Sequence, residues 1–560
     1  MENPQKTAKR KSPWLKIHDE LEIGPIAKDD RPLAEHVALH AKERPDAPAL
    51  LFFDKIISFA EYDSTTSRLA NALRNLGIGK GDVVGFLMPN LPQYAFAVAA
   101  CSRLGAIGTG LSPLCSPPEL AYQISDAKAQ VVIALSDLVP KLQAMPDIPD
   151  CLSSVIITDA MDDIAPGKTE LPDMPGVNVV SYCNIMSEAS DECAQVPTDW
   201  NDTFMIQYTG GTTGKPKGAQ LSIRNIMHNP LLSNSLGAPL EMGKEVWASP
   251  FPLFHIAGLF SVASAARQGT LFFLLPDPRD LAQLVKQMQK FPPTLIGAVP
   301  ALTEMLMATP GFEKVDLSRL KTWGSGAAPI SSQTVAELCQ RVGEGKLSDS
   351  FGMTETSGAY IANPPKRYKF GSVGIPLPET DLRIMDVEKG DVEVPAGEPG
   401  ELCVSGPQVM KGYLNLPDET ANALREIDGR TYMYSGDVGY MDEEGFVFLC
   451  DRAKDMLIVG GYKVFSVEIE DKLKSLPMVE ASAIVGKADE DRPGNDIVHL
   501  FVQLTEDHRN RDEDELRSEL MTYFAENMAI YKKPRAIHFV DAIPLTPIGK
   551  IDKKLLRAEL

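Results

Sequence analysis

The sequence predicts an α/β fold in which a large N-terminal domain of layered α/β sub-domains carries a small β-rich unit and is followed by a small α+β domain. Three observations support this prediction. The chain has 560 residues, which is too long for one ordinary domain. Apolar, β-rich runs alternate with helical patterns over roughly the first 300 residues, which is typical of α/β layers. The pattern then changes, from residue 381 to short strands between turns and after residue 454 to a separate βαβ-like pattern.

The strands of the layered part are predicted from short apolar runs. These runs cover residues 83–87, 131–135, 155–157, 271–275 and 294–299. One helix is predicted to begin near Pro92, which suits a first turn, and to stop at Gly105. Another is predicted from one buried stripe at i, i+3, i+4 and i+7 spacing, formed by Leu281, Leu284, Val285 and Met288.

The acidic and polar segment 187–202 predicts a seam between two sub-domains. It gives way to residues 203–208, TFMIQY, which predict a strand that enters a glycine-rich loop. Between residues 381 and 447, turns such as Glu398-Pro399-Gly400 separate short strand-like runs. These runs predict the small β-rich unit.

The composition is that of a globular protein with an excess of acidic residues. Hydrophobic residues make up 44% of the chain and charged residues 23%, which excludes overall disorder. The formal net charge of −21 disfavours nucleic acid as a partner. The eight cysteines are scattered singly, the first residues lack a secretory signal, and no run reaches the ~18 apolar residues that span a bilayer. We therefore expect reduced thiols and a cytoplasmic location.

Residues 1–30 are predicted to form a flexible arm. The basic cluster of this arm lies between two prolines and consists of Lys6, Lys9, Arg10 and Lys11. We expect a solvated, frayed end. Contact with a membrane surface is the alternative.

The segment 208–218, YTGGTTGKPKG, predicts a phosphate-binding loop. It holds four glycines, three threonines and two lysines in eleven residues. Glycines let backbone N–H groups approach an oxyanion, hydroxyls donate further hydrogen bonds, and lysine supplies positive charge. Pro216 follows Lys215, so this is not a Walker A loop. A flexible surface hairpin is the alternative.

Six further motifs follow this loop along the chain. They are PLFHIAG at 252–258, GSGAAP at 324–329, FGMTE at 351–355, YSGD at 434–437, DRAKDMLIVGGYKVFSVEIE at 451–470 and PLTPIGKIDK at 544–553. Together the motifs resemble the adenylate-forming superfamily of acyl-CoA synthetases, peptide-synthetase adenylation domains and firefly-type luciferases, over residues from about 30 to 560. PQVMKGY at 407–413 and QYTGGTTG at 207–214 look most similar to medium- or long-chain fatty-acid CoA ligases.

The resemblance implies a site for ATP, Mg²⁺ and CoA. Glu355 and Thr212 are expected to bind Mg²⁺, and Thr212 can also contact the phosphates. Asp437 is expected to accept hydrogen bonds from the ribose hydroxyls with the help of Arg452, for which a salt bridge at a domain boundary is the alternative. Phe351 stands where the family more often has Tyr, and its ring face is expected to stack on adenine. The residues that the resemblance assigns to the nucleotide, its phosphates and CoA are Thr209, Gly210, Gly211, Thr213, Gly214, Lys217, Gly326, Ala327, Ser350, Phe351, Gly352, Met353, Thr354, Asp437, Arg452, Gly460, Gly461 and Lys463.

The resemblance implies four catalytic residues. Two are Glu355 and Thr212, described above, and the other two are His255 and Lys550. His255 is expected to orient or gate the acid substrate, with a satisfied core histidine as the alternative. Lys550 is expected to bridge the substrate carboxylate and the α-phosphate during adenylation, with a basic solvated tail as the alternative. The resemblance assigns the acid to His255, Gly324, Ser325 and Gly326.

The resemblance also implies a hinge at Lys454. The predicted parts are then the arm 1–30, a large adenylation domain 31–453 and a small, mobile C-terminal domain 454–560. One orientation of the small domain brings Lys550 to the adenylate. The other brings Gly460, Gly461 and Lys463 to the pantetheine tunnel.

These features predict an AMP-forming acid–CoA ligase. ATP and a carboxylic acid give acyl-AMP and pyrophosphate, and CoA then gives acyl-CoA and AMP. A medium- or long-chain fatty acid is our first choice of substrate, and an aryl or cyclic acid is the second. An acyl-AMP ligase that loads a carrier protein, a luciferase-like oxidase and a non-catalytic acyl-binding homologue are the alternatives. The expected partners are small molecules and not nucleic acid, while a homodimer and peripheral membrane contact stay open.

Overall fold

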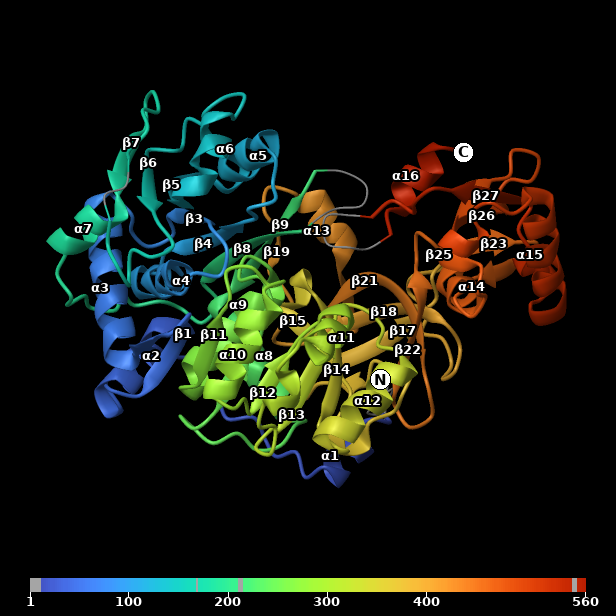
Figure 1. The fold of residues 1–560 in the computed structure, drawn as a ribbon, viewed down its shortest axis with the longest axis horizontal. Coiled ribbons are helices and arrows are strands. Elements are labelled where there is room, and N and C mark those ends of the chain that lie inside the picture. The colour runs from blue at the N-terminus through green and yellow to red at the C-terminus, as the bar shows by residue number, and fades with distance from the viewer. Residues whose placement is uncertain (1–11, 168–169, 210–214, 546–550) are drawn as a thin grey trace, which may run out of the picture.

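A computed structural model describes residues 12–167, 170–209, 215–545 and 551–560. Two large sheets lie side by side in the first part of the chain, and the last part forms a smaller lobe beside a third sheet (Figure 1). The layers combine parallel strands with flanking helices. This arrangement confirms the predicted α/β fold class.

The first large sheet has the strand order β19-β9-β8-β4-β3-β5-β6-β7. Strands β3 to β8 pair in parallel, and β9 and β19 add an antiparallel edge. The strands are β3 (Val83–Leu87), β4 (Ile107–Leu111), β5 (Ala129–Leu135), β6 (Ser154–Thr158), β7 (Asn178–Ser181), β8 (Thr203–Thr209), β9 (Lys217–Ser222) and β19 (Gly412–Tyr413). The helices along this part of the chain are α3 (Phe59–Asn75), α4 (Pro92–Leu104), α5 (Pro117–Ala127), α6 (Val139–Gln143), α7 (Tyr182–Glu188) and α8 (Ile223–Asn234).

The second large sheet has the order β16-β15-β14-β13-β12-β10-β11-β1-β2. Its strands are β1 (Pro48–Phe52), β2 (Lys55–Ser58), β10 (Val246–Ala248), β11 (Leu271–Leu274), β12 (Leu295–Gly297), β13 (Thr322–Gly326), β14 (Leu347–Met353), β15 (Gly358–Ala362) and β16 (Ile375–Pro376). The helices α2 (Leu33–Glu43), α9 (Ile256–Gln268), α10 (Leu281–Lys290), α11 (Pro300–Ala308) and α12 (Ser332–Val342) accompany it. The strand predicted at 294–299 is shorter than expected, because Val299 already forms the N-cap of α11.

Helix α4 shows how the apolar pattern of the sequence builds the core between the two sheets. Every residue of α4 is buried, and it starts at Pro92 and ends at Gly105 in the left-handed region (φ 67°), as predicted. One hydrophobic cluster joins it to Phe86 of the first sheet and Phe272 of the second. Helix α10 instead buries only its predicted stripe of Leu281, Leu284, Val285 and Met288, together with Gln287.

The predicted β-rich unit is a smaller sheet in the order β17-β18-β21-β20, with β22 paired to β21. Its elements are β17 (Asp381–Met385), β18 (Gly400–Ser405), α13 (Pro417–Ala423), β20 (Leu424–Ile427), β21 (Arg430–Met441) and β22 (Val447–Arg452). Because β22 runs directly towards Lys454, this sheet carries the C-terminal lobe at its end.

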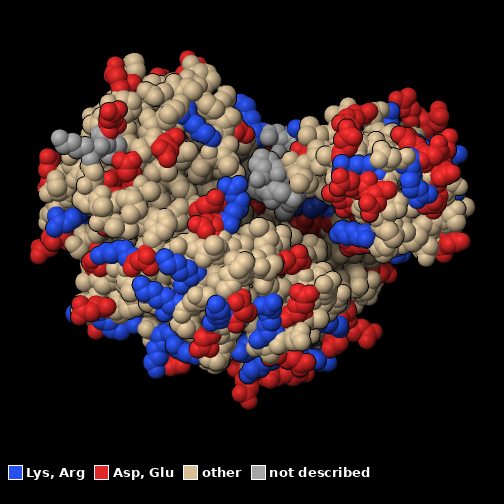
Figure 2. All heavy atoms as spheres, in the orientation of Figure 1, with Lys and Arg blue, Asp and Glu red and all other residues tan. Residues whose placement is uncertain are grey.

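The C-terminal lobe has a hydrophobic core of its own, which includes Leu457, Ile469, Leu500 and Phe524. It contains β23 (Leu457–Val459), β24 (Tyr462–Val464), α14 (Ser466–Leu473), β25 (Val479–Ala488), β26 (Asp496–Leu504), α15 (Glu513–Asn527), β27 (Ala536–Val540) and α16 (Lys553–Ala558). Figure 2 shows Asp and Glu side chains densely placed on this lobe. The domain boundary at 453 and the mobility of the lobe stay predictions.

Two local predictions are wrong. The segment 187–202 is no seam, since β8 after it pairs in parallel with β4 of the same sheet. The arm does not extend to residue 30, because α1 (Leu15–Glu20) packs on the protein with Trp14 and Ile17 each only 2% exposed. The basic cluster at Lys6 to Lys11 lies outside the described residues.

All eight cysteines are free thiols, as predicted. Across the described stretches, no helix has the length and the apolar character that crossing a bilayer requires.

Candidate active site

Glu355 lies where the two large sheets meet. It follows the hairpin strand β14 in a short 3-10 turn, and β15 leads away from it. Its hydroxyl partner is Tyr413 of β19, which donates a 2.7 Å hydrogen bond to Glu355 Oε1, while Met410 N donates to the Glu355 carbonyl at 2.8 Å. Tyr413 in turn pairs with Ala219 of the first sheet. The Glu355 carboxylate is thus buried, 6% exposed, and held from both sheets.

Glycine is required in the hairpin that carries Glu355. A Cβ at Gly352 would lie 2.0 Å from the carbonyl oxygen of Gly358. No side chain fits at that distance, so the FGMTE segment can only close in this way with glycine at its second position. Met353 ends β14, and Thr354 begins the turn.

A lysine lies over the ring of this tyrosine. Lys217 Nζ is 5.1 Å from the ring centroid of Tyr413 and 2.5 Å from Glu419 Oε2. Burial first, and then the charges of Glu355 and Glu419, raise the pKa of Tyr413, whereas Arg452 opposes the rise. Tyr413 is therefore a neutral hydroxyl donor near physiological pH. Arg452 lies close enough for its charge to affect the pKa of Tyr413.

Asp437 and Arg452 form an ion pair across paired strands. They are register partners on β21 and β22, and Arg452 Nε lies 3.0 Å from Asp437 Oδ1. Asp437 is 7% exposed, whereas the Arg452 side chain is half-exposed. The Tyr360 ring is fully buried nearby. This burial, and then the Asp437 charge, raise the pKa of Tyr360.

Tyr360 connects this ion pair to Phe351. The two rings pack edge to face with centroids 5.6 Å apart. Phe351 precedes Glu355 on the β14 hairpin, so the Asp437 pair of the β-rich sheet, the two rings and the Glu355 carboxylate follow one another from one sheet to the next. This order suits a nucleotide with its ribose and base towards Asp437 and Phe351 and its phosphates towards Glu355.

The GSGAAP segment runs beside β14. Ser325 and Gly326 of β13 pair in parallel with Asp349 and Ser350, and Ser350 Oγ donates to the Ser325 carbonyl at 3.1 Å. A Cβ at Gly326 would lie 2.7 Å from the Ser350 carbonyl oxygen, so this glycine permits the close approach. Ala327 has a positive φ of 65° and turns the chain away from the sheet.

His255 forms the N-cap of α9. Its Nδ1 accepts a hydrogen bond from Ala257 N at 3.3 Å, and its side chain is exposed. The residue before it is held by Gln207, whose Nε2 donates to the Phe254 carbonyl at 3.2 Å. His255 is therefore no buried core histidine, which removes the alternative given above.

The phosphate loop is described only at its two ends. Thr209 ends β8, and its Oγ1 lies 3.5 Å from the Lys217 carbonyl across the hairpin. Gly210, Gly211, Thr212, Thr213 and Gly214 lie outside the described residues, as does Lys550. The roles predicted for them stay predictions.

The segment around Lys454, the predicted hinge, is bound to the C-terminal helix α16. Arg557 Nη2 donates to the Lys454 carbonyl at 3.3 Å and pairs with Asp455. Partial desolvation, with the Arg452 and Arg557 charges, lowers the pKa of Lys454. Rotation about Lys454 would therefore have to change contacts that α16 makes.

The glycine pair of the hinge motif forms a separate hairpin. Gly460 and Gly461, with φ of 60° and 81°, turn β23 into β24, and Gly460 N donates to Asn495 Oδ1 at 2.6 Å. The backbone amide of Lys389 chiefly lowers the pKa of Asp386, and the charge of Lys463 adds to it. Within the described residues, this hairpin thus contacts its own lobe, the Lys463 charge reaches the β-rich unit, and no interaction joins the hairpin to Glu355.

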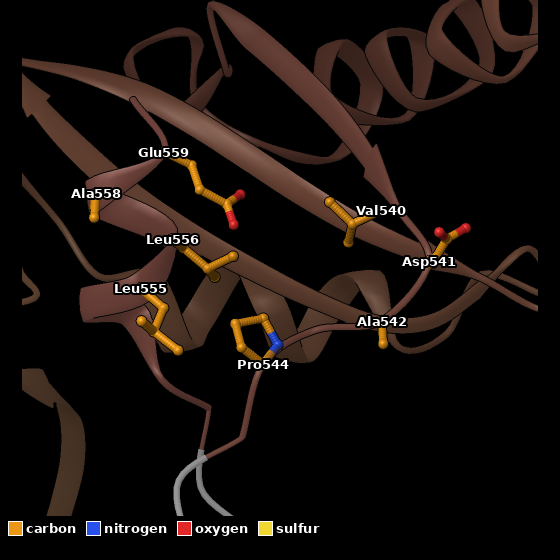
Figure 3. A pocket seen from close by; sticks show the side chains of 8 residues that line it. All are labelled: Val540, Asp541, Ala542, Pro544, Leu555, Leu556, Ala558 and Glu559. Atoms are coloured by element: carbon orange, nitrogen blue, oxygen red, sulfur yellow. The ribbon is translucent and has the colours of Figure 1, made fainter.

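One surface pocket lies elsewhere. Figure 3 shows it between β27 and α16, where Val540, Pro544 and Leu556 line it with two acidic side chains, Asp541 and Glu559. None of the predicted site residues lines it. Its acidic lining does not suit an anionic acid or phosphate.

Two family comparisons decide the identity of the fold and site. The model of the AMP-binding enzyme family matches residues 37–414, and that of the AMP-binding enzyme C-terminal domain matches residues 468–550. The chain belongs to the AMP-binding enzyme family. The resemblance to adenylate-forming enzymes that the motifs indicated is thereby confirmed, and with it the prediction of an enzyme.

The relatives of this AMP-binding enzyme include long-chain-fatty-acid–CoA ligases. The one from Bacillus subtilis (strain 168) is 33% identical over 530 residues, and the one from Escherichia coli O6:H1 is 32% identical over 531 residues, each covering 92% of both chains. A 4-coumarate–CoA ligase 2 from Oryza sativa subsp. japonica is 31% identical over 546 residues, 94% of this chain and 92% of the relative.

Solved structures of such enzymes superpose over nearly the whole AMP-binding enzyme. Mycobacterium tuberculosis fatty acyl CoA synthetase has a TM-score of 0.73 at 25% identity, covering 95% of this chain and 99% of its own. Bacillus subtilis o-succinylbenzoate coenzyme A synthetase, solved with ATP and a magnesium ion, has a TM-score of 0.75 at 25% identity, covering 93% and 99%.

The Glu355 site of the AMP-binding enzyme fits Mg²⁺ as a nucleotide-bound ion. Among the residues that the structure describes, no group of three or more His, Cys, Asp or Glu side chains could hold a metal by itself. A single buried carboxylate is sufficient when substrate phosphates and water supply the remaining oxygen ligands, which is the usual arrangement for Mg²⁺. Tyr413 orients that carboxylate.

Sequence reasoning missed Tyr413, Tyr360 and Glu419 at the AMP-binding enzyme's site. Tyr413 belongs to the PQVMKGY segment, but it is 58 residues from Glu355. Only the pairing of β19 with β9 brings it there. Its position at the end of a recognised motif was the one signal that could have drawn attention to it.

Proposed function

We propose that this enzyme is an AMP-forming acid–CoA ligase whose substrate is a medium- or long-chain fatty acid. The observation that carries the activity is the proximity of the Asp437–Arg452 pair of the β-rich sheet, through Tyr360, to Phe351 and the buried Glu355 carboxylate of the second large sheet. The observation that supports the substrate is the match to two long-chain-fatty-acid–CoA ligases over 92% of the chain.

The first half-reaction joins two anions. A carboxylate oxygen of the acid attacks the α-phosphorus of ATP, the bond to the bridging oxygen breaks, and pyrophosphate leaves with its electron pair. Asp437 holds the ribose, Phe351 packs on the adenine, and Lys550 neutralises the carboxylate and α-phosphate as they approach. A bound Mg²⁺ ion at Glu355 and Thr212 would neutralise phosphate charge.

The second half-reaction needs less help from the protein. The CoA sulfur attacks the acyl carbon of the adenylate, the thiol proton is lost, and AMP leaves as the mixed anhydride breaks. The Gly460–Gly461 hairpin and Lys463 would line the approach of the pantetheine arm after rotation about Lys454. His255, at the start of α9, would orient the acid in both steps.

An aryl or cyclic acid is the second candidate. The rice 4-coumarate–CoA ligase 2 relative, at 31% identity over 94% of this chain, supports it. Pyrophosphate release therefore has to be measured with ATP, Mg²⁺ and acids from acetate to palmitate, together with benzoate and 4-coumarate, each with and without CoA. The Lys550→Ala protein, prepared in the same way, controls for contaminating synthetases.

We expect CoA-dependent turnover that is highest for fatty acids of eight or more carbons. Turnover with the aryl acids alone would replace the fatty-acid proposal by the second candidate. Pyrophosphate release without CoA-dependent AMP formation would point to an acyl-AMP ligase. Absence of turnover with every acid, from protein that melts cooperatively, would contradict the ligase proposal.

A further inference from the structure

Two buried polar atoms face one point in the second large sheet and have no hydrogen-bond partner among the described residues. They are Nε1 of Trp247 and Oγ of Ser249. Trp247 is 9% exposed and Ser249 is 1% exposed. Buried polar groups are normally hydrogen-bonded, and leaving one unpaired destabilises a protein. Such a pair is therefore expected to have a function.

The point that these atoms face is the missing side chain of Gly297. A Cβ built on Gly297 would lie 3.4 Å from Trp247 Nε1, 3.5 Å from Ser249 Oγ and 3.4 Å from Phe251 Cε2. These are ordinary contact distances, so both polar atoms and the Phe251 ring border the bare face of Gly297, against which an atom of a bound chain can pack. The indole N–H is a donor only, whereas the serine hydroxyl both donates and accepts. An oxygen atom satisfies both.

This point lies beside the segment predicted to hold the acid. Gly297 pairs in parallel with Gly324, the first residue of GSGAAP, so both residues point to the same face of the sheet. At Gly324 an added Cβ would meet only the Ile296 carbonyl, at 3.5 Å. Phe251, the third neighbour, stands four residues before His255.

One aromatic ring connects this point to the Glu355 region. The Phe260 ring of α9 packs edge to face on Trp247, with centroids 6.2 Å apart. On its other side, Phe260 Cδ2 lies 3.5 Å from the Cβ position of Gly358, which follows the Glu355 turn. Only the Phe260 ring thus separates Trp247 from the hairpin that carries Glu355.

We propose that Trp247 Nε1 and Ser249 Oγ form a polar subsite for the acyl chain, which selects acids that carry an oxygen atom along the chain over their unsubstituted counterparts. The inference rests on the proposed acid–CoA ligase function and narrows its substrate class. A hydroxyl or carbonyl oxygen accepts from the indole and exchanges a hydrogen bond with the serine. A plain alkyl chain desolvates both groups without replacing their hydrogen bonds.

Matched acids test this subsite. Dodecanoate is compared with monohydroxydodecanoates substituted at each position from 3 to 12, and cinnamate with 4-coumarate, which separates hydroxyalkyl from phenolic oxygen. Affinity is measured by calorimetry on the full-length enzyme with Mg²⁺ and a non-hydrolysable ATP analogue, and turnover by CoA-dependent pyrophosphate release. We expect one hydroxyl position, or the phenol, to bind on the order of tenfold more tightly than its counterpart.

Three variants locate the preference. Ser249→Ala and Trp247→Phe each remove one polar atom, and Phe retains the ring that packs on Phe260 and Phe272. Gly297→Ala fills the shared point at the contact distances given above. All three should bring the affinity ratio close to one. Ser261→Ala is the matched control, because this serine is 1% exposed and its hydroxyl already donates to the Ala257 carbonyl at 2.9 Å.

The two proposals fail in different ways. A wild-type affinity ratio near one for every pair, or a preference that survives in Ser249→Ala, Trp247→Phe and Gly297→Ala, overturns the subsite. Such a result would mean that an ordered water, and not the acyl chain, forms the hydrogen bonds of the two polar atoms. Absence of CoA-dependent turnover with every acid overturns the ligase function, and the calorimetric ratio still decides the subsite.

Discussion

Nε of Arg452 lies 3.0 Å from Oδ1 of Asp437, and the two residues are register partners on neighbouring strands. The strand pairing sets their separation before any ligand binds. The guanidinium can therefore orient the carboxylate for the two hydroxyls of a ribose. Because Arg452 is half-exposed, its own contribution is smaller than that of the buried Asp437.

Asp437→Asn should raise the KM for ATP between about tenfold and 100-fold, because a hydrogen bond to a charged acceptor is replaced by a neutral one. The KM for the acid should change little. Asp381→Asn is the control, since Asp381 accepts from Tyr432 in the same small sheet. An unchanged KM for ATP in Asp437→Asn would refute the ribose role.

Tyr413→Phe should raise the Mg²⁺ concentration needed for half-maximal activity by about tenfold, because it removes the hydroxyl that orients Glu355. The ring beneath Lys217 is retained. Activity is measured over a Mg²⁺ titration at saturating ATP. Tyr432→Phe removes a similar hydroxyl–carboxylate bond outside the site and should leave the titration unchanged. If both variants shift it equally, Tyr413 has only a structural role.

Arg557→Ala should expose the hinge to protease, because it removes the bonds that α16 makes to the Lys454 carbonyl and to Asp455. Limited digestion with trypsin should cleave after Arg452 or Lys454 several-fold faster than in the wild type, by mass spectrometry of the fragments. Arg511→Ala, which breaks the Arg511–Glu519 pair elsewhere in the lobe, is the control. Equal cleavage rates in wild type and Arg557→Ala would contradict a role of α16 in holding the hinge.

Asp29→Asn should lower the thermal midpoint most near neutral pH. Burial alone would raise the pKa of Asp29, but the hydrogen bond from Arg31 and the charges of His36 and Arg267 lower it to about 2. In the unfolded chain the pKa is about 3.9, so the unfolded state binds the proton first as the pH falls. The stabilisation by Asp29 is thus fully present above about pH 4 and is lost as the pH approaches 2.

The midpoint difference between wild type and Asp29→Asn, measured by calorimetry from pH 7 downwards, should therefore shrink below about pH 4. Arg267 is the penultimate residue of α9, so the same variant also tests the anchorage of the helix that starts beside His255. Asp277→Asn is the control, because its partner Arg279 is exposed. A difference that is constant over this range would exclude the charged network as its cause.

Local patterns predicted much of the fold. The stripe on α10 and the ends of α4 follow from side-chain periodicity, proline and glycine, which act within a few residues. The two wrong predictions both depend on distant contacts. The backbone of β8 pairs with β4, about a hundred residues earlier. Trp14 packs so closely against Gly445 that a Cβ added there would lie 2.5 Å from the Trp14 backbone nitrogen.

The motifs by themselves determined the family, because glycines, hydroxyls, carboxylates and lysines stand along the chain in the family's order, and from that order the residues for phosphate, ribose and acid are predicted. Tertiary structure alone decided which side chains meet. Tyr413 reaches Glu355 because β19 pairs with β9, and Trp247 and Ser249 face one point because β10, β12 and β13 stand side by side. Such contacts depend on the pairing of strands far apart in the chain, and local propensities do not encode that pairing.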